Sequence, residues 1–349
     1  MRFCSPQIAV TCMLICLNPL VSSAGEPSAP VKVGIIGMDS YHALAFTQLF
    51  HDPKAEGGLA GIRVVAAFPG GSPDIAESAE SLPKWLEQIK PFGVEMVDSI
   101  DALLAKVDAV MITSLDGRVH LEQARAVIAA GKPLFIDRPL AASLADAVEI
   151  FRLAGERGVP CFACSQHRFS PGFIGMRNHP EVGRVLGCDV YGGCPREPHH
   201  PDLFWHSIHG VETLYTIMGP GCKSVTRAST DQAELVTGIW ADGRVGTYRG
   251  IRQGAVKYSA LVFGSDGIAS AGVYGYAAPV NGVVPPGRYM GYESVAIEIG
   301  KFFKTRDPPV GAEETIEIFA FLEAAEESKR QGGAPVTLES VLLKARAKK

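Results

Sequence analysis

The sequence predicts an α/β protein: a doubly wound parallel sheet, then an α+β domain with a mainly antiparallel sheet. From residue 31 to residue 164, β-branched runs alternate with segments of helical apolar spacing, which is typical of parallel strands covered by helices. From residue 165 to residue 349, short strand candidates are separated by turn residues instead. A chain of 349 residues is also longer than one ordinary core requires, so two domains are expected.

The first domain begins with a strand over Val31–Ile36 and a helix over Tyr41–Phe50, and the apolar run Ile62–Phe68 predicts the second strand. Ser99 and Ser143 are typical helix N-caps. The other expected elements, in chain order, are a short helix to Leu104, strand Ala109–Thr113, helix His120–Ala130, strand Leu134–Ile136, a helix from Ser143 to Gly155, and strand Cys161–Ala163.

In the second domain, Ala241–Arg244 contains Asp-Gly between two strand candidates, which is a strong hairpin signal. Near the end of the chain, Ala312–Gln331 predicts a long amphipathic helix, with Ile316, Phe319 and Leu322 on one stripe. The short strand candidates are Gly187–Tyr191, Val236–Trp240, Val245–Arg249 and Ser259–Phe263.

Composition limits the classes of function. A hydrophobic fraction of 47% with 20% charged residues fits a globular protein and excludes a mainly disordered one. The formal net charge of −4 gives no basic surface for nucleic acid. We therefore expect a small molecule, rather than a nucleic acid, as the partner.

Residues 1–24 have the pattern of a secretory signal peptide. Arg2 precedes the apolar run Ile8–Leu20, and Ser22-Ser23-Ala24 offers a small-residue cleavage site. A buried N-terminal helix is the alternative, and the run is shorter than the ~20 residues of a membrane span. We expect an exported protein, periplasmic or extracellular, with no membrane span once the signal is removed.

Four ordered blocks carry a resemblance to a known family: Thr113–His120, Gly131–Pro139, Gln166–Pro171 and His199–Glu212. They resemble the Gfo/Idh/MocA family of glucose–fructose oxidoreductases and inositol dehydrogenases, in which three of the stretches read Gly-Lys-x-x-x-x-Glu-Lys-Pro, Arg-Phe-x-Pro and Asp-x-x-x-His. The resemblance implies a Rossmann domain over residues 31–164, a substrate and oligomerisation domain over residues 165–349, and NAD or NADP as cofactor. Relatives often pair subunits through open sheet faces, so a homo-oligomer is compatible with it.

The expected cofactor loop follows the first strand. Gly34 and Gly37 allow a tight turn beneath a pyrophosphate, but the next two glycine positions of Gly-x-Gly-x-x-Gly hold Asp39 and His42. A carboxylate at Asp39 repels a pyrophosphate unless it turns away, so loss of dinucleotide binding stays open as an alternative. After the second strand, Ser72 is placed to bind the ribose or a 2′-phosphate. The residues expected at the cofactor are Gly34, Gly37, Met38, Asp39, Ser40, Ser72, Thr113, Ser114, Leu115, His120, Asp137, Arg138 and Pro139.

The resemblance also implies catalytic residues. The family's lysine beside the nicotinamide is Arg138 here, and an arginine keeps the charge but is a poor general acid. The family's aspartate falls at Trp205, which leaves His209 as the titratable group suited to taking a hydroxyl proton. The expected catalytic residues are His209, Arg138 and His206, and the expected substrate contacts are Arg168, Asp202, His206 and His209.

Several readings of the function remain at this point. The first is an oxidoreductase that acts on a sugar, polyol or sugar acid with a nicotinamide cofactor. A non-redox carbohydrate hydrolase or lyase, with His206 and His209 as acid and base, is the second. The third is a non-catalytic member of the fold that binds carbohydrate. A divalent metal ion is a further alternative for the polar set His199, His200, Asp202, His206 and His209.

Overall fold

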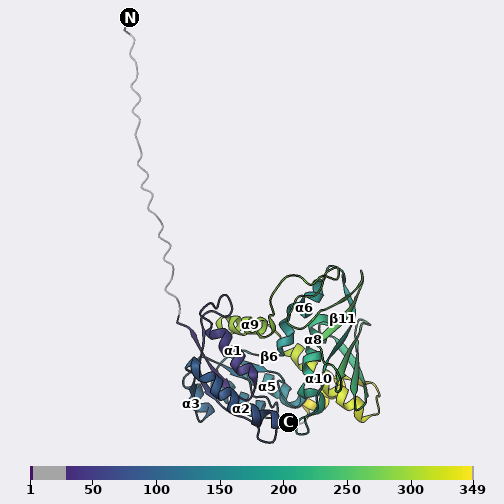
Figure 1. Cartoon of the computed structure of the whole chain (residues 1–349), viewed down its shortest axis with the longest axis horizontal. Coiled ribbons are helices and arrows are strands. Elements are labelled where there is room, and N and C mark those ends of the chain that lie inside the picture. Colours follow the sequence, from purple (N-terminus) through teal and green to yellow (C-terminus); the bar gives the residue numbers. More distant parts are fainter. Residues whose placement is uncertain (3–28, 348–349) are drawn as a thin grey trace.

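The computed structural model describes residues 1–2 and 29–347, which form two sheets with helices packed on and between them (Figure 1). Apart from its first two residues, the predicted signal peptide over residues 1–24 lies outside the described residues. No helix within the described part of the chain has both the length and the apolar character needed to cross a membrane.

The first sheet is parallel and has the strand order β3-β2-β1-β4-β5-β6, which confirms the doubly wound prediction. The order reverses between β1 and β4, so the switch point of the sheet lies at the carboxyl ends of these two strands. The strands are β1 (Val31–Ile36), β2 (Ile62–Phe68), β3 (Glu95–Met96), β4 (Ala109–Ile112), β5 (Leu134–Asp137) and β6 (Cys161–Cys164).

Both faces of the first sheet are apolar because alternate strand residues point to opposite sides. Ile36 and Ile112 pack in a core with the helices of one face, whereas Val33 and Met111 pack in a second core on the other face. The helices of this domain are α1 (Tyr41–His51), α2 (Ala76–Ile89), α3 (Ile100–Leu104), α4 (His120–Ala129) and α5 (Leu144–Arg157). Ser99 and Ser143 cap α3 and α5 by accepting backbone N–H groups, as predicted.

The second sheet has the order β12-β11-β7-β10-β9-β8-β13 and is antiparallel except between β7 and β10. Val245 pairs with Ile239 at the predicted hairpin. The strands are β7 (Val185–Gly193), β8 (Cys222–Ser229), β9 (Ala233–Trp240), β10 (Val245–Ile251), β11 (Ser259–Gly264), β12 (Ile268–Ser270) and β13 (Val336–Thr337). The other helices are α6 (Pro171–Ile174), α7 (Asp202–Trp205), α8 (Ile208–Met218), α9 (Gly291–Thr305), α10 (Ala312–Arg330) and α11 (Leu338–Arg346), with a 3₁₀ turn at Gln166–Phe169.

Helix α9 departs from the simple division at residue 164. It belongs to the second half of the sequence, yet it packs beside α1 (Figure 1) and shares the core of the first domain. Its Phe302 ring lies 4.8 Å from the ring of Phe162 in β6, measured between centroids. The two sheets therefore follow the predicted boundary, but the packing of the first domain includes a later segment.

Helix α10 packs against β8, α5 and β6, so it contacts both domains. Phe319 and Leu322 are buried as predicted and Ile316 is half-buried, while Ile318 and Phe321 are buried as well. The buried face is wider than the predicted stripe because the helix has neighbours on more than one side.

Candidate active site

A buried polar cluster lies between the two domains at the carboxyl end of the first sheet. Arg138 follows β5, and His167 lies in the turn after β6. His206 and His209 come from the junction of α7 and α8, and Tyr258 directly precedes β11. We call these five residues the inter-domain cluster.

The rings of the cluster are close together. The His209 centroid lies 4.8 Å from that of His167 and 5.7 Å from that of His206. Tyr258 meets His167 edge-on at 4.8 Å. The structure thus brings His209 and His206 together, as the sequence predicts, and adds His167 and Tyr258, which the sequence analysis did not single out.

A hydrogen-bond chain orients His209. Its Nδ1 lies 2.7 Å from the hydroxyl oxygen of Ser165, which also accepts the backbone N–H of His167 at 3.1 Å. The Ser165 hydroxyl lies 3.4 Å from Oε1 of Gln166 and can donate to it. When the Ser165 proton points to Gln166, Ser165 accepts from Nδ1–H of His209, and this tautomer leaves Nε2 as a proton acceptor.

The imidazoles of the cluster are neutral at physiological pH. Burial lowers the pKa of His209 well below its usual range, and the nearby positive charge of Arg138 lowers it further. The same two causes, burial first, lower the pKa of His206 and of His167 to about 3. A neutral imidazole in this position is ready to accept a proton.

Arg138 is the fixed charge of the cluster. Its side chain is buried, and its Nε and Nη1 atoms have no hydrogen-bond partner among the described residues. The neighbouring carboxylate of Asp137 contacts Nδ1 of His42 with one oxygen and accepts the Arg138 backbone N–H at 2.8 Å with the other. The guanidinium therefore has no carboxylate of its own among the described residues.

Arg168, which was expected to bind substrate, does not face this cluster as a free cation. It is buried and forms two ion pairs at 2.7 Å, one with Glu212 of α8 and one with Glu314 of α10. Two carboxylates compensate its charge, so it joins helices of the second domain to the turn after β6.

Asp202, also expected to contact substrate, lies in an ion-pair network of the second domain. It forms ion pairs at 2.7 Å with Arg227 of β8 and with Arg252, which follows β10. These arginines also bind Glu234 of β9 at 2.7 Å. The network holds the start of α7 on the second sheet and engages both Asp202 oxygens.

The predicted cofactor residues meet at the switch point, where most of them bind one another. Gly37 has φ +93°, and a Cβ there would lie 2.2 Å from the backbone nitrogen of Ser114, so only glycine allows this approach. Thr113 donates to the Gly37 carbonyl at 2.7 Å, and the His120 ring bridges the carbonyls of Ser114 and Leu140 at 2.9 and 3.2 Å. Gly34, Met38, Ser40 and Pro139 are also buried.

Asp39 does not turn away from the switch point. Its carboxylate accepts the Leu115 N–H at 3.1 Å and the Ser78 hydroxyl at 2.6 Å, and burial raises its pKa. Ser72 donates to Asp116 at 2.7 Å. These hydrogen bonds occupy donors that the sequence analysis had assigned to the cofactor, and Ser78 and Asp116 were not foreseen.

An apolar contact closes the same region. Ile75, Leu115 and Trp205 form one small buried cluster that joins the loop after β2, the loop after β4 and α7. We call it the plug. The His200 ring lies 5.2 Å from the ring of Trp205, and its buried Nε2 has no hydrogen-bond partner among the described residues. The loops that would line a dinucleotide are present, and Trp205 packs against two of them at Ile75 and Leu115.

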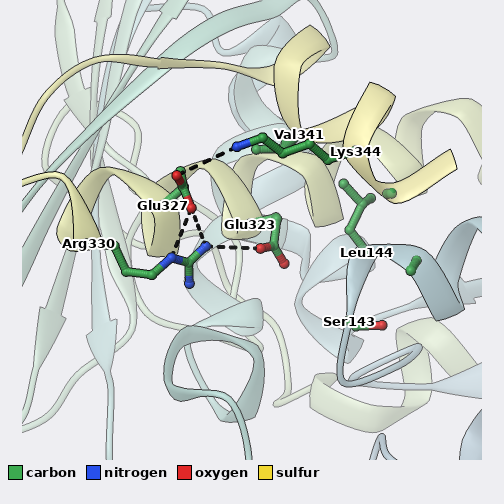
Figure 2. A pocket seen from close by; sticks show the side chains of 9 residues that line it. Ser143, Leu144, Glu323, Glu327, Arg330, Val341 and Lys344 are labelled. Carbon is green, nitrogen blue, oxygen red and sulfur yellow. Dashed lines mark hydrogen bonds and ion pairs between the residues drawn. The ribbon is translucent and has the colours of Figure 1, made fainter. Parts of the chain in front are cut away.

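A hollow at the junction of α5, α10 and α11 is a weaker candidate (Figure 2). Its charges neutralise one another: Arg330 pairs with Glu327 at 2.7 Å and with Glu323 at 3.3 Å, and Lys344 lies 3.7 Å from Glu327.

Within the described ranges, no group of three or more histidine, cysteine or acidic residues is placed to hold a metal ion. The metal alternative therefore gains no support.

Residues 31–164 match the model of the oxidoreductase family with an NAD-binding Rossmann fold, GFO_IDH_MocA. The first domain of the chain thus matches the Gfo/Idh/MocA family. The loops just described are thus those of an NAD-binding Rossmann domain, and the resemblance read from the four sequence blocks is confirmed.

Two inositol dehydrogenases of Saccharopolyspora erythraea are similar in sequence. Inositol 2-dehydrogenase 1 is 30% identical over 163 residues, which are 44% of this chain and 42% of that protein. Inositol 2-dehydrogenase 3 is 30% identical over 134 residues, or 36% of this chain and 37% of that protein. The aligned part spans less than half the length of either relative.

Solved structures extend the similarity of fold to both domains. A probable dehydrogenase from Thermotoga maritima has a TM-score of 0.69 at 18% identity and covers 89% of this chain and 100% of its own. The scyllo-inositol dehydrogenase of Lactobacillus casei, solved with NAD(H) and scyllo-inositol, has a TM-score of 0.68 at 15% identity and covers 89% and 99%. At these identities the comparison shows the shared fold.

Proposed function

We propose that the protein is a nicotinamide-dependent oxidoreductase that acts on a hydroxyl group of a polyol, sugar or sugar acid. The observation that carries the proposal is His209, a buried neutral imidazole oriented by Ser165 at the carboxyl end of an NAD-binding Rossmann domain. The inositol dehydrogenases among the similar proteins support a polyhydroxylated substrate.

A bound NAD or NADP would supply the acceptor for a hydride from the carbon that carries the hydroxyl group. The loops at Gly37, Thr113–Leu115 and Asp137–Pro139 would hold it at the switch point, with Ser72 at the adenosine end. Nε2 of His209 accepts the hydroxyl proton, because Nδ1 is held by Ser165.

Arg138 has a different role from His209. Its guanidinium stays charged, so it binds and stabilises the oxygen that becomes negative as the proton leaves. His206 shares this side of the cluster with His209 and is placed to contact a second hydroxyl group. Burial of the cluster excludes water from the reacting atoms.

The test is a screen of polyols, sugars and sugar acids for absorbance of reduced cofactor, with NAD and NADP in parallel. We expect His209→Gln to abolish turnover and to leave cofactor binding unchanged. His199→Gln, a substitution at a half-exposed histidine outside the cluster, is the matched control and should retain activity. Failure of both dinucleotides to bind at millimolar concentration would overturn the redox proposal.

The arrangement at the switch point favours a second candidate, a non-redox lyase or hydrolase that uses His209 as its base. Asp39 and the plug occupy the region of the cofactor, whereas the inter-domain cluster is complete without it. Turnover of a carbohydrate in protein freed of nicotinamide would establish this candidate. Binding without turnover in either condition would instead indicate a carbohydrate-binding protein.

We also propose that the protein is exported, on the strength of the N-terminal pattern from Arg2 to Ala24. N-terminal sequencing of protein from fractionated cells should begin near Gly25 in the exported fraction. Recovery of Met1 from the mature protein would contradict the proposal.

Self-association through the open face of the second sheet is a further proposal. Ile239, Val245, Leu261 and Ile268 expose large apolar side chains there, each from a different strand. Exposed apolar side chains that gather on one face are typical of an interface. Light scattering should give a multiple of the monomer mass, and Leu261→Glu should reduce it.

A further inference from the structure

The buried arginines of the second domain differ from Arg138 in one respect. Arg168 pairs with two carboxylates, Arg227 with three and Arg252 with two. Arg138 is 7% exposed and has no carboxylate within ion-pair distance among the described residues. A buried charge without a partner is costly, and proteins normally neutralise it.

The surroundings of Arg138 do not supply the missing charge. Both oxygens of Asp137 are engaged, one by His42 and one by a backbone N–H group. His167, His206 and His209 are neutral at physiological pH, since burial and Arg138 itself lower their pKa values. Burial raises the pKa of Tyr258, so its hydroxyl is also uncharged.

We infer that Arg138 is the anchor for a carboxylate of the substrate, so that the substrate is a sugar acid or another hydroxylated acid rather than a neutral polyol. The inference rests on the proposed function and narrows its substrate class. The unpartnered Nε and Nη1 atoms provide two donors for this carboxylate, which Arg138 then binds in place of the reacting oxygen, and the imidazoles of His206 and His209 remain for the hydroxyl groups.

The single positive charge of the Arg138 guanidinium favours a carboxylate over a phosphate as the bound anion. Arg168, in the turn after β6, could supply a second cation, but its two acidic partners already neutralise it. A phosphate monoester carries about −1.5 to −2 charges at neutral pH, so one guanidinium would leave it undercompensated in a buried site. A carboxylate carries one charge and matches the guanidinium donors in geometry.

Calorimetric titration of the full chain tests the inference, with matched pairs of acid and neutral compound: D-glucuronate with D-glucose, and D-gluconate with D-glucitol. Each titration is done with and without NAD, and D-glucose 6-phosphate is the phosphate probe. We expect at least one acid to bind about tenfold to a hundredfold more tightly than its neutral partner, the range for hydrogen bonds to a charged group. It should also raise the melting temperature of the unaltered protein.

Arg138→Met should remove the preference for the acid, and Arg138→Lys should restore part of it. Arg196→Met removes the same charge from a half-exposed side chain and should leave the preference intact. Equal affinity for acid and neutral compounds, tighter binding of the phosphate ester, or a preference that survives Arg138→Met would overturn the inference. If an acid binds but no cofactor is reduced, the anion site at Arg138 is supported and the redox proposal is overturned. If the cofactor is reduced with D-glucose, and D-glucose binds as tightly as D-glucuronate, the redox proposal is supported and the anion site is overturned.

Discussion

Trp205→Ala should open the switch point to a dinucleotide. Trp205 packs against Ile75 and Leu115 in the plug, and it is 3% exposed. A buried aromatic side chain removes roughly 200 Å² from water, worth about 5 kcal/mol at ~25 cal/mol per Å². The rings of His200 and His206 lie 5.2 and 5.5 Å from that of Trp205, so we assign roughly half of this area to the plug.

The arrangement in which Trp205 packs on Ile75 and Leu115 is then favoured by about 2 to 3 kcal/mol over one in which it does not. If NAD binds only when these contacts are broken, each ~1.4 kcal/mol of this preference lowers the observed affinity for NAD tenfold. Trp205→Ala should therefore raise the affinity for NAD by a factor of about 30 to 150, measured by calorimetry. The same variant should be less stable towards urea by about 3 to 5 kcal/mol, because it loses a large buried side chain.

Trp240→Ala is the control. Trp240 is 2% exposed and lies in the second sheet, so its truncation should cost similar stability without a change in NAD affinity. Unchanged NAD affinity in a folded Trp205→Ala protein, or the same gain in Trp240→Ala, would refute the account of the plug.

Three other predictions concern charge. Asp39→Asn should raise the affinity for NAD because it removes a carboxylate from the expected pyrophosphate position. The gain should be larger at low ionic strength, and calorimetry at two salt concentrations measures it. An equal gain at both concentrations would argue against electrostatic repulsion. His209 can act as a base only above its pKa, which burial lowers well below the usual range. The value of kcat/KM should therefore stay level from about pH 6 to 8 and fall only in more acidic solution. An inflection near pH 6.5 that is assigned to His209 would contradict its burial. Glu212→Gln leaves Arg168 with one acidic partner and should lower the free energy of unfolding in urea by about 3 to 5 kcal/mol. The control Arg330→Gln changes an exposed pair and should lower it by about 1 kcal/mol or less. Equal losses in the two variants would be evidence against a buried pair at Arg168.

Most of the first sheet was predictable because its signals are local. Strand alternation and the caps at Ser99 and Ser143 depend on residues within a few positions of each other. Helix α2 gave no clear signal, since it contains Pro83 and only Ser78 and Ile89 are buried. Helix α9 was missed for another reason: its core partners in α1 and β6 are more than a hundred positions away in sequence.

Part of the candidate site was also predictable from the sequence. Arg138, His206 and His209 follow strand and helix ends, and the topology of the sheet brings these ends together. Arg168 and Asp202 occur in the same sequence blocks, but their ion-pair partners come from α8, α10 and the second sheet. A sequence shows which side chains carry charge, and only the fold decides which charges neutralise each other.

The position of α9 has a consequence for synthesis and for fragments of the protein. Phe46, Phe135 and Phe162 belong to the core that α9 covers, so residues 31–164 alone would leave these rings poorly covered. During translation the first domain cannot complete its packing until residues 291–305 have left the ribosome, long after its own sheet strands have emerged. An N-terminal fragment that ends at residue 164 is therefore expected to aggregate, and a separately supplied segment containing α9 to rescue it.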